Sequence, residues 1–166
     1  ANLYSFFPTS IPLPINALCH ASLELEQNRK HLQEGDANKF VLERLGRFLA
    51  NIFVQQANDS DNQFCALDLL SPTYLINGYQ EDIHYLHSAL VESLKSKKIF
   101  PVLSGKRLSA SEALTLPLGV NKSDWLPKSI FPTILISRNR DETTLFKLLG
   151  GSDLDSDGFI TLLNSE

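Results

Sequence analysis

Residues 22–33 read SLELEQNRKHLQ, and this stretch decides how the first part of the chain folds. Leu23 and Leu25 alternate with glutamates, so the sequence predicts a strand over residues 15–25 that buries the leucines and exposes the glutamates. The chain is then expected to turn at Arg29 and enter an amphipathic helix. A guanidinium at such a corner can point away from its own domain, because arginine stays charged and offers a planar fork of donors.

The next stretch, residues 40–54, reads FVLERLGRFLANIFV and repeats apolar residues at the spacing of a helix. Gly35 breaks the preceding segment, and Asp36 is expected to cap this helix. Arg44 and Arg47 are expected on its polar side. The expected apolar stripe comprises Phe40, Val41, Leu45, Phe48, Leu49, Ile52 and Phe53.

Further elements follow in alternation along the chain. Ser109 and Glu112 have the spacing of a capping box, which predicts a short helix. The order of strands separated by helices predicts an α/β fold. The remaining strands are expected at residues 3–7, 99–103 and 133–137, and the remaining helices at residues 64–70, 80–97, 142–149 and 156–163.

Length and composition limit the classes of protein that fit. The 166 residues, of which 43% are hydrophobic and 20% charged, suit one globular domain with a proper core, or such a domain with a small appendage. The net charge of −4 argues against a general nucleic-acid binder, which needs a basic face. The sequence has neither a run of roughly 20 apolar residues nor a signal-peptide pattern, so we expect no membrane partner.

Cysteine usage and the first residue add two expectations. Cys19 and Cys65 lie in apolar runs, which favours buried free thiols over a disulfide and a cytoplasmic location. The sequence contains no methionine and begins at Ala1. We therefore expect it to be an excised piece of a longer protein.

The stretch 22–33 resembles the catalytic loop in the middle domain of the ninety-kilodalton heat-shock chaperones. Leu23 and Leu25 match two leucines of that loop, and Lys30 stands where the family has glutamate. Upstream, residues 4–9, YSFFPT, and 13–17, LPINA, are similar to the sacsin and NO VEIN branch of the GHKL ATPases. The loop's serine, arginine, leucine and glutamine fall on Asn28, Arg29, Leu32 and Gln33.

The resemblance implies an α/β middle domain, with a small mixed sheet flanked by helices, that follows a GHKL ATPase domain. Residues 1–57 would form a strand-loop-helix unit carrying the catalytic-loop arginine, and residues 58–166 further α/β elements of the same compact domain. Arg29, with Asn28 beside it, would reach the γ-phosphate of ATP bound with magnesium in the upstream domain. Gln33 would position that phosphate or the lid, and a protein client could be a further partner.

Motifs for adenine and magnesium binding are not found in this sequence, so we expect the chain to bind no ATP by itself. A second class of function stays open, a purely structural protein-interaction module in which Arg29 only shapes a turn. The third is a calcium-responsive module. Asp153, Asp155 and Asp157 match the first ligands of an EF-hand loop, although its twelfth position is Asn164 instead of glutamate.

The residues Asp153, Asp155 and Asp157 have an alternative interpretation, which is that they cap the final helix. His84 and His87, near Glu81 and Asp82, could share one helix face, but a third metal ligand at a suitable spacing is missing. A surface or half-buried pair is therefore the favoured interpretation. Gly105 and the lysine after it suit a hairpin turn better than a phosphate-binding loop.

Overall fold

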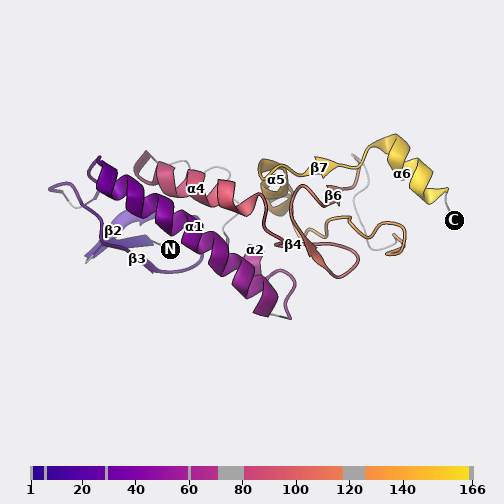
Figure 1. The fold of residues 1–166 in the computed structure, drawn as a ribbon, viewed down its shortest axis with the longest axis horizontal. Helices are drawn as coiled ribbons and strands as arrows, with labels where there is room; N and C mark the ends of the chain where they lie inside the picture. The colour runs from indigo at the N-terminus through magenta and orange to yellow at the C-terminus, as the bar shows by residue number, and fades with distance from the viewer. Residues whose placement is uncertain are drawn as a thin grey trace.

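The computed structural model describes residues 2–5, 7–28, 30–59, 61–70, 81–117 and 126–164. Figure 1 shows an elongated molecule, with the N-terminal strands and the long helix α1 at one end and the C-terminal helix α6 at the other. Helices and short strands are mixed throughout, which confirms the expected α/β fold with a small mixed sheet flanked by helices.

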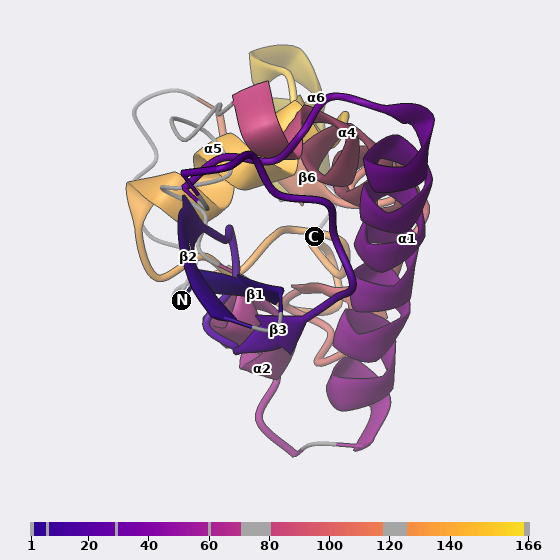
Figure 2. The ribbon, with the colours of Figure 1, turned by 90° about the vertical axis from the view of Figure 1, so that its left-hand side faces the viewer.

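The sheet is built from β1 (Asn2–Ser5), β2 (Phe7–Pro12) and β3 (Cys19–His20) in the order β2-β1-β3. β2 runs antiparallel to β1, whereas β3 runs parallel to it. Thr9 supports the irregular pairing of β1 and β2, because its hydroxyl donates to the carbonyl oxygen of Leu3 at 2.7 Å. Figure 2 shows this sheet beside α1.

The prediction of a strand over residues 15–25 is mostly wrong, since only β3 within that range is a strand. Beyond β3, the side chain of Ser5 makes the hydrogen bonds that backbone groups would make between paired strands. Its hydroxyl donates to the carbonyl oxygen of Leu23 at 2.8 Å and accepts from the Leu23 amide at 3.0 Å. The predicted burial of these side chains is largely confirmed: Leu23 is buried and Leu25 half-buried, while Glu24 and Glu26 are exposed.

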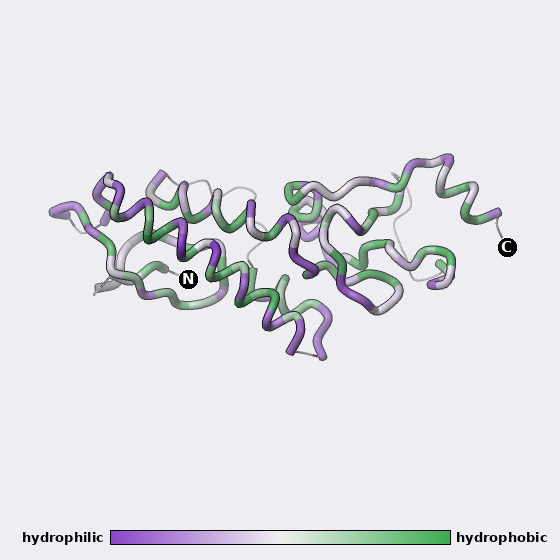
Figure 3. Tube along the Cα trace, in the orientation of Figure 1, coloured by the Kyte–Doolittle hydropathy of each residue, from purple (hydrophilic) through white to green (hydrophobic). Residues whose placement is uncertain are grey.

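The helix α1 (Asp36–Asp59) is longer than the sequence predicts. Residues 30–35 are not helical, so the helix expected directly after Arg29 is wrong. The expected apolar stripe is also partly wrong, because Phe40 and Phe48 are both 59% exposed. The buried face instead comprises Asn38, Leu42, Gly46, Leu49, Ala50, Phe53 and Ala57. Figure 3 shows hydrophobic residues recurring along α1 between hydrophilic ones.

The small residue Gly46 explains which face of α1 is buried. A Cβ atom on Gly46 would lie 2.6 Å from the carbonyl oxygen of Leu86 and 3.0 Å from the amide nitrogen of Leu90. Both of these residues belong to α4 (His84–Leu94), which follows the 3-10 turn η1 (Glu81–Ile83). The backbones of α1 and α4 therefore touch at Gly46, and larger neighbouring side chains cannot lie between them.

The other expected helices are confirmed with small changes in their bounds. They are α2 (Cys65–Leu69), α5 (Arg140–Leu148) and α6 (Ser156–Leu163). The capping box of Ser109 and Glu112 forms, since a Glu112 carboxylate oxygen accepts from the Ser109 amide at 2.9 Å and from its hydroxyl at 2.8 Å. These bonds lower the pKa of Glu112 to about 2. The expected helix there is wrong, because the chain makes only a turn.

The C-terminal half contains two strand pairs. β4 (Phe100–Pro101) and β5 (Arg107–Leu108) form the expected hairpin, with Gly105 at a φ of +79° in its turn. β6 (Leu114–Thr115) pairs in parallel with β7 (Ser152–Asp153). The strand expected at 133–137 is wrong, because Ile134 and Leu135 make only isolated bridges.

One main hydrophobic core joins both halves of the molecule. Its buried members extend from Leu3 in the sheet to Leu149 after α5. Phe100 and Phe146 meet edge to face within it, with ring centroids 5.2 Å apart. A smaller cluster lies in the C-terminal half and consists of Leu103, Leu126, Phe131 and Ile134.

The close approach at Gly46 leads to the first prediction. Gly46→Ala should lower the free energy of unfolding by about 1–3 kcal/mol, the usual cost of overpacking, despite the higher helix propensity of alanine. Urea denaturation would measure this. The control is Arg47→Ala on the exposed side of the same helix, which should change stability by less than about 0.5 kcal/mol. Equal stability of the two variants would contradict the tight contact.

Candidate functional site

The candidate site is built around a short hairpin with arms at residues 24–28 and 30–33, which we call the 24–33 hairpin. Leu25 and Leu32 form an antiparallel bridge. The Glu26 amide donates to the carbonyl oxygen of His31 at 3.1 Å, and the Gln33 amide donates to that of Glu24 at 2.9 Å. The hairpin leads into α1 at the end of the molecule opposite the C-terminus (Figure 1).

Asn38, one turn into α1, holds the base of the hairpin. Its amide nitrogen donates to the carbonyl oxygens of Glu24 and Gln33, both at 2.7 Å. Its amide oxygen accepts from the Glu24 amide at 2.8 Å. Because Asn38 is buried and bonds both arms, it fixes the orientation of the hairpin relative to α1.

Asn28, which the sequence singled out, lies at the tip of the hairpin. Asn28 shapes the tip, since its side-chain oxygen accepts from the Lys30 amide at 2.8 Å and its side-chain nitrogen donates to Glu26 at 3.0 Å. Asn28 and Lys30 are both exposed. Arg29 lies between them and is outside the described residues, so the expectation of an exposed guanidinium there stays a prediction.

An open cavity of about 870 Å³ borders the hairpin. Gln33 lines it, so the structure brings this sequence-predicted residue into the same region as Lys30. The Lys39 ammonium lies 5.1 Å from the centre of the Tyr85 ring on the α4 side. The cavity also has charged and titratable groups that can bind a polar ligand through ion pairs and hydrogen bonds: Glu26, His31, Glu34, Asp36, Glu81 and His84.

The acidic run near the C-terminus has another use in this structure. Asp155 caps α6, and its carboxylate accepts from the Gly158 amide at 2.5 Å. Asp153 pairs with Lys147 at 2.8 Å and accepts from the Thr115 hydroxyl, and these bonds lower the pKa of Asp153. Asp157 is exposed in the first turn of α6. These contacts match the alternative of an acidic helix cap.

Two further findings concern the described residues as a whole. Among them, no group of three or more His, Cys, Asp or Glu side chains is arranged to hold a metal ion. None of the helices described has the length and apolar character needed to cross a membrane.

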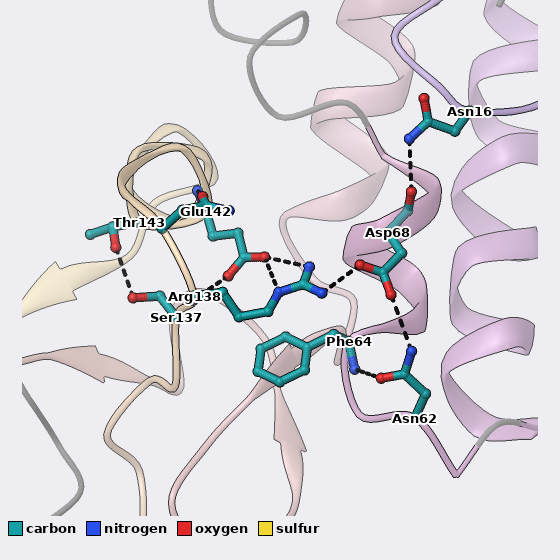
Figure 4. Close-up of polar contacts among 9 residues, drawn as sticks. Asn16, Asn62, Phe64, Asp68, Ser137, Arg138, Glu142 and Thr143 are labelled. Atoms are coloured by element: carbon teal, nitrogen blue, oxygen red, sulfur yellow. Dashed lines mark hydrogen bonds and ion pairs between the residues drawn. The ribbon is translucent and has the colours of Figure 1, made fainter.

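A second polar cluster joins the two halves of the molecule (Figure 4). Arg138 forms ion pairs with Asp68 on α2 at 2.6 Å and with Glu142 on α5 at 2.5 Å. Its guanidinium also lies 4.4 Å from the centre of the Phe64 ring. Burial lowers the pKa of Arg138, but its bonds to Glu142 and Asp68 outweigh that effect and raise it. Glu142 is only 2% exposed, so this cluster is a structural link.

Asn38 and Arg138 do not stand out in the sequence as functional or structural residues. A signal existed for Asn38, since an asparagine in the first turn of a helix often bonds nearby backbone groups. Arg138 has no comparable signal, because Asp68 is distant in the sequence and only folding brings the two together.

Comparison of the chain with protein-family models, with curated proteins and with solved structures gave no match.

The bonds of Asn38 lead to the second prediction. Asn38→Asp should lower the free energy of unfolding by about 1–3 kcal/mol, because a carboxylate oxygen would face two carbonyl oxygens in place of the amide donor. Hydrogen exchange should speed up at the amides of Glu24, Glu26 and Gln33. Asn51→Asp on the same helix is the control, since Asn51 is exposed and its side-chain oxygen accepts from the Lys97 ammonium. Unchanged exchange in Asn38→Asp would contradict the anchoring role.

The Arg138 cluster leads to the third prediction. Arg138→Ala should lower the free energy of unfolding by about 2 kcal/mol, because Glu142 would stay buried without its ion pair. The loss should be smaller than for a fully buried pair, since the guanidinium side chain is 42% exposed. Thermal and urea unfolding would measure it. Lys95→Ala, which removes an exposed pair with Glu92, should have almost no effect, and similar losses in both variants would contradict the linking role.

Proposed function

We propose that this chain is the middle domain of a GHKL-type ATPase of the sacsin and NO VEIN branch, and that Arg29 acts on ATP bound in an upstream domain. The observation that supports this proposal is the anchoring of the 24–33 hairpin by Asn38. A hairpin whose two arms are fixed to a long helix offers a defined support for a residue at its tip. Precise support matters, because a small displacement of a catalytic group greatly reduces its effect.

Arginine suits the proposed role for chemical reasons. A guanidinium stays charged at every physiological pH and can bond two phosphate oxygens at once. In phosphoryl transfer, an inserted arginine stabilises the charge that develops on the transferred group. Asn28 would keep the tip in shape, and Gln33 would contact the phosphate or the lid from the neighbouring cavity.

The proposal divides the work between two domains. The upstream domain would bind ATP and magnesium, and this chain would supply Arg29 and a surface for a protein client. The cycle would drive a chaperone-like or signalling change of conformation in the cytoplasm. This chain alone would neither bind ATP tightly nor hydrolyse it.

One observation favours a second candidate, a protein-interaction module without a catalytic contribution. Phe40 and Phe48 on α1 are both 59% exposed, and Leu18 is 69% exposed. Large apolar side chains that gather on a surface often mark a contact with another protein. In this second candidate, Arg29 would only shape the hairpin.

ATP turnover by the longer protein separates the two candidates. If Arg29 is catalytic, Arg29→Ala should lower kcat by about 10³-fold or more, as for arginine fingers, with a smaller change in KM. Arg140→Ala removes an exposed arginine from α5 and should leave kcat unchanged. An unchanged kcat in Arg29→Ala would favour the interaction module.

Calorimetry on the isolated chain gives an independent test. ATP should bind no more tightly than about millimolar, because the sequence has no adenine or magnesium motif. Saturable micromolar binding would contradict the proposed division of work between two domains.

A further inference from the structure

An apolar groove lies between α1 and residues 15–20, which include the edge strand β3. Leu18 and Cys19 form one wall, and Leu45, Phe48 and Ile52 of α1 form the other. Its volume is about 230 Å³, which is smaller than the usual site for a cofactor or drug-sized ligand. The groove is therefore suited to hold a few apolar side chains of a larger partner.

The walls of the groove combine exposed and half-buried apolar groups. Leu18 and Phe48 are 69% and 59% exposed, whereas Leu45 and Ile52 are half-buried. Cys19 is also half-buried, and burial raises the pKa of its thiol, so that at neutral pH it is an uncharged, apolar part of the wall. A groove with an exposed apolar rim and half-buried walls is typical of a surface that anchors a partner's side chain.

The charges beside the groove indicate the chemistry of the partner. The exposed Arg44 and Arg47 are sequence neighbours of Leu45 and Phe48 in the α1 wall of the groove, whereas Glu43 beside them is half-buried. The whole chain, in contrast, has a net charge of −4. Arg44 lies one helical turn from both Phe40 and Phe48, and its guanidinium is 5.3 Å from the centre of the Phe40 ring.

Both arginines are available for a partner's carboxylates. Within the part of the chain that the structure describes, neither Arg44 nor Arg47 forms an ion pair. Unpaired cations next to an apolar groove favour a partner that presents acidic groups beside apolar ones, because complementary charges guide and orient association.

The secondary structure around the groove indicates the form of the partner. The sheet edge at the groove is β3, which has only two residues and can offer few backbone bonds to an added strand. α1, by contrast, is a straight support of 24 residues. A helix packed along α1 can place apolar side chains at every turn into the groove and carboxylates over the arginines.

From this combination we propose that the groove binds an acidic amphipathic helix of a partner protein. Apolar side chains on one face of that helix enter between Leu18 and Phe48. Its glutamates or aspartates pair with Arg44 and Arg47. This binding surface does not involve the 24–33 hairpin, so it does not depend on the role proposed for Arg29.

A synthetic peptide of about 20 residues, long enough to be helical, provides the probe. It has leucines at i, i+3, i+4 and i+7 positions and glutamates and alanines elsewhere, with a fluorescent label at one end. Anisotropy should show saturable binding with a Kd below roughly 100 μM, weakening as salt rises. A scrambled peptide of the same composition, and one with lysines for glutamates, should bind at least tenfold more weakly.

Variants of the chain locate the binding. Phe48→Ser and Arg44→Glu change exposed side chains and should each weaken peptide binding by at least tenfold without altering the thermal midpoint. The matched controls are Ile160→Ser on α6, where the isoleucine is 54% exposed, and Arg140→Glu on α5, and both should bind normally. Arg44→Glu should also bind the lysine peptide more tightly than the unmodified chain does.

Several results would overturn the proposal. These are no saturable binding, equal binding of the scrambled peptide, or normal binding by both Phe48→Ser and Arg44→Glu. Tighter binding of duplex DNA or of phosphatidylserine vesicles, lost in Arg44→Glu, would assign the surface to a nucleic acid or a membrane instead. Concentration-dependent self-association that disappears in Phe48→Ser would assign it to a second copy of the chain.

Discussion

The contact of α1 with α4 at Gly46 is the constraint on which the other parts of the structure depend. A glycine at this position lets the backbones of the two helices approach to a distance that excludes any Cβ atom. The rotation of α1 about its own axis follows from that contact, because Gly46 must face α4. The same rotation buries Asn38 beneath the hairpin and leaves Phe40 and Phe48 in solvent.

The helix α1 therefore supports both surfaces that have a proposed role. The N-terminal end of α1 holds the 24–33 hairpin through Asn38, and its middle turns form a wall of the apolar groove. Arg138 provides the second link, because it ties α2, close to α1 in the chain, to α5 in the C-terminal half. The main core also extends across both halves.

Segments with a strong local pattern were predicted well. The helices expected at residues 80–97 and 142–149 are present as α4 and α5. The hairpin turn at Gly105 and the bonds of the capping box at Ser109 also form as expected. In each case the residues that determine the conformation lie within one or two turns of one another, so local energetics decide the outcome.

What the sequence by itself determined was the α/β class, most helices, the acidic cap of α6, and the sides of Leu23 and Glu24. Only the tertiary structure decided which face of α1 is buried, since apolar residues occur on two sides of that helix and Gly46 favours one. It also decided that residues 24–33 form a hairpin instead of a strand and a helix. Ser5 and Asn38 bond that segment from elsewhere in the chain, and such long-range bonds leave no local pattern in the sequence.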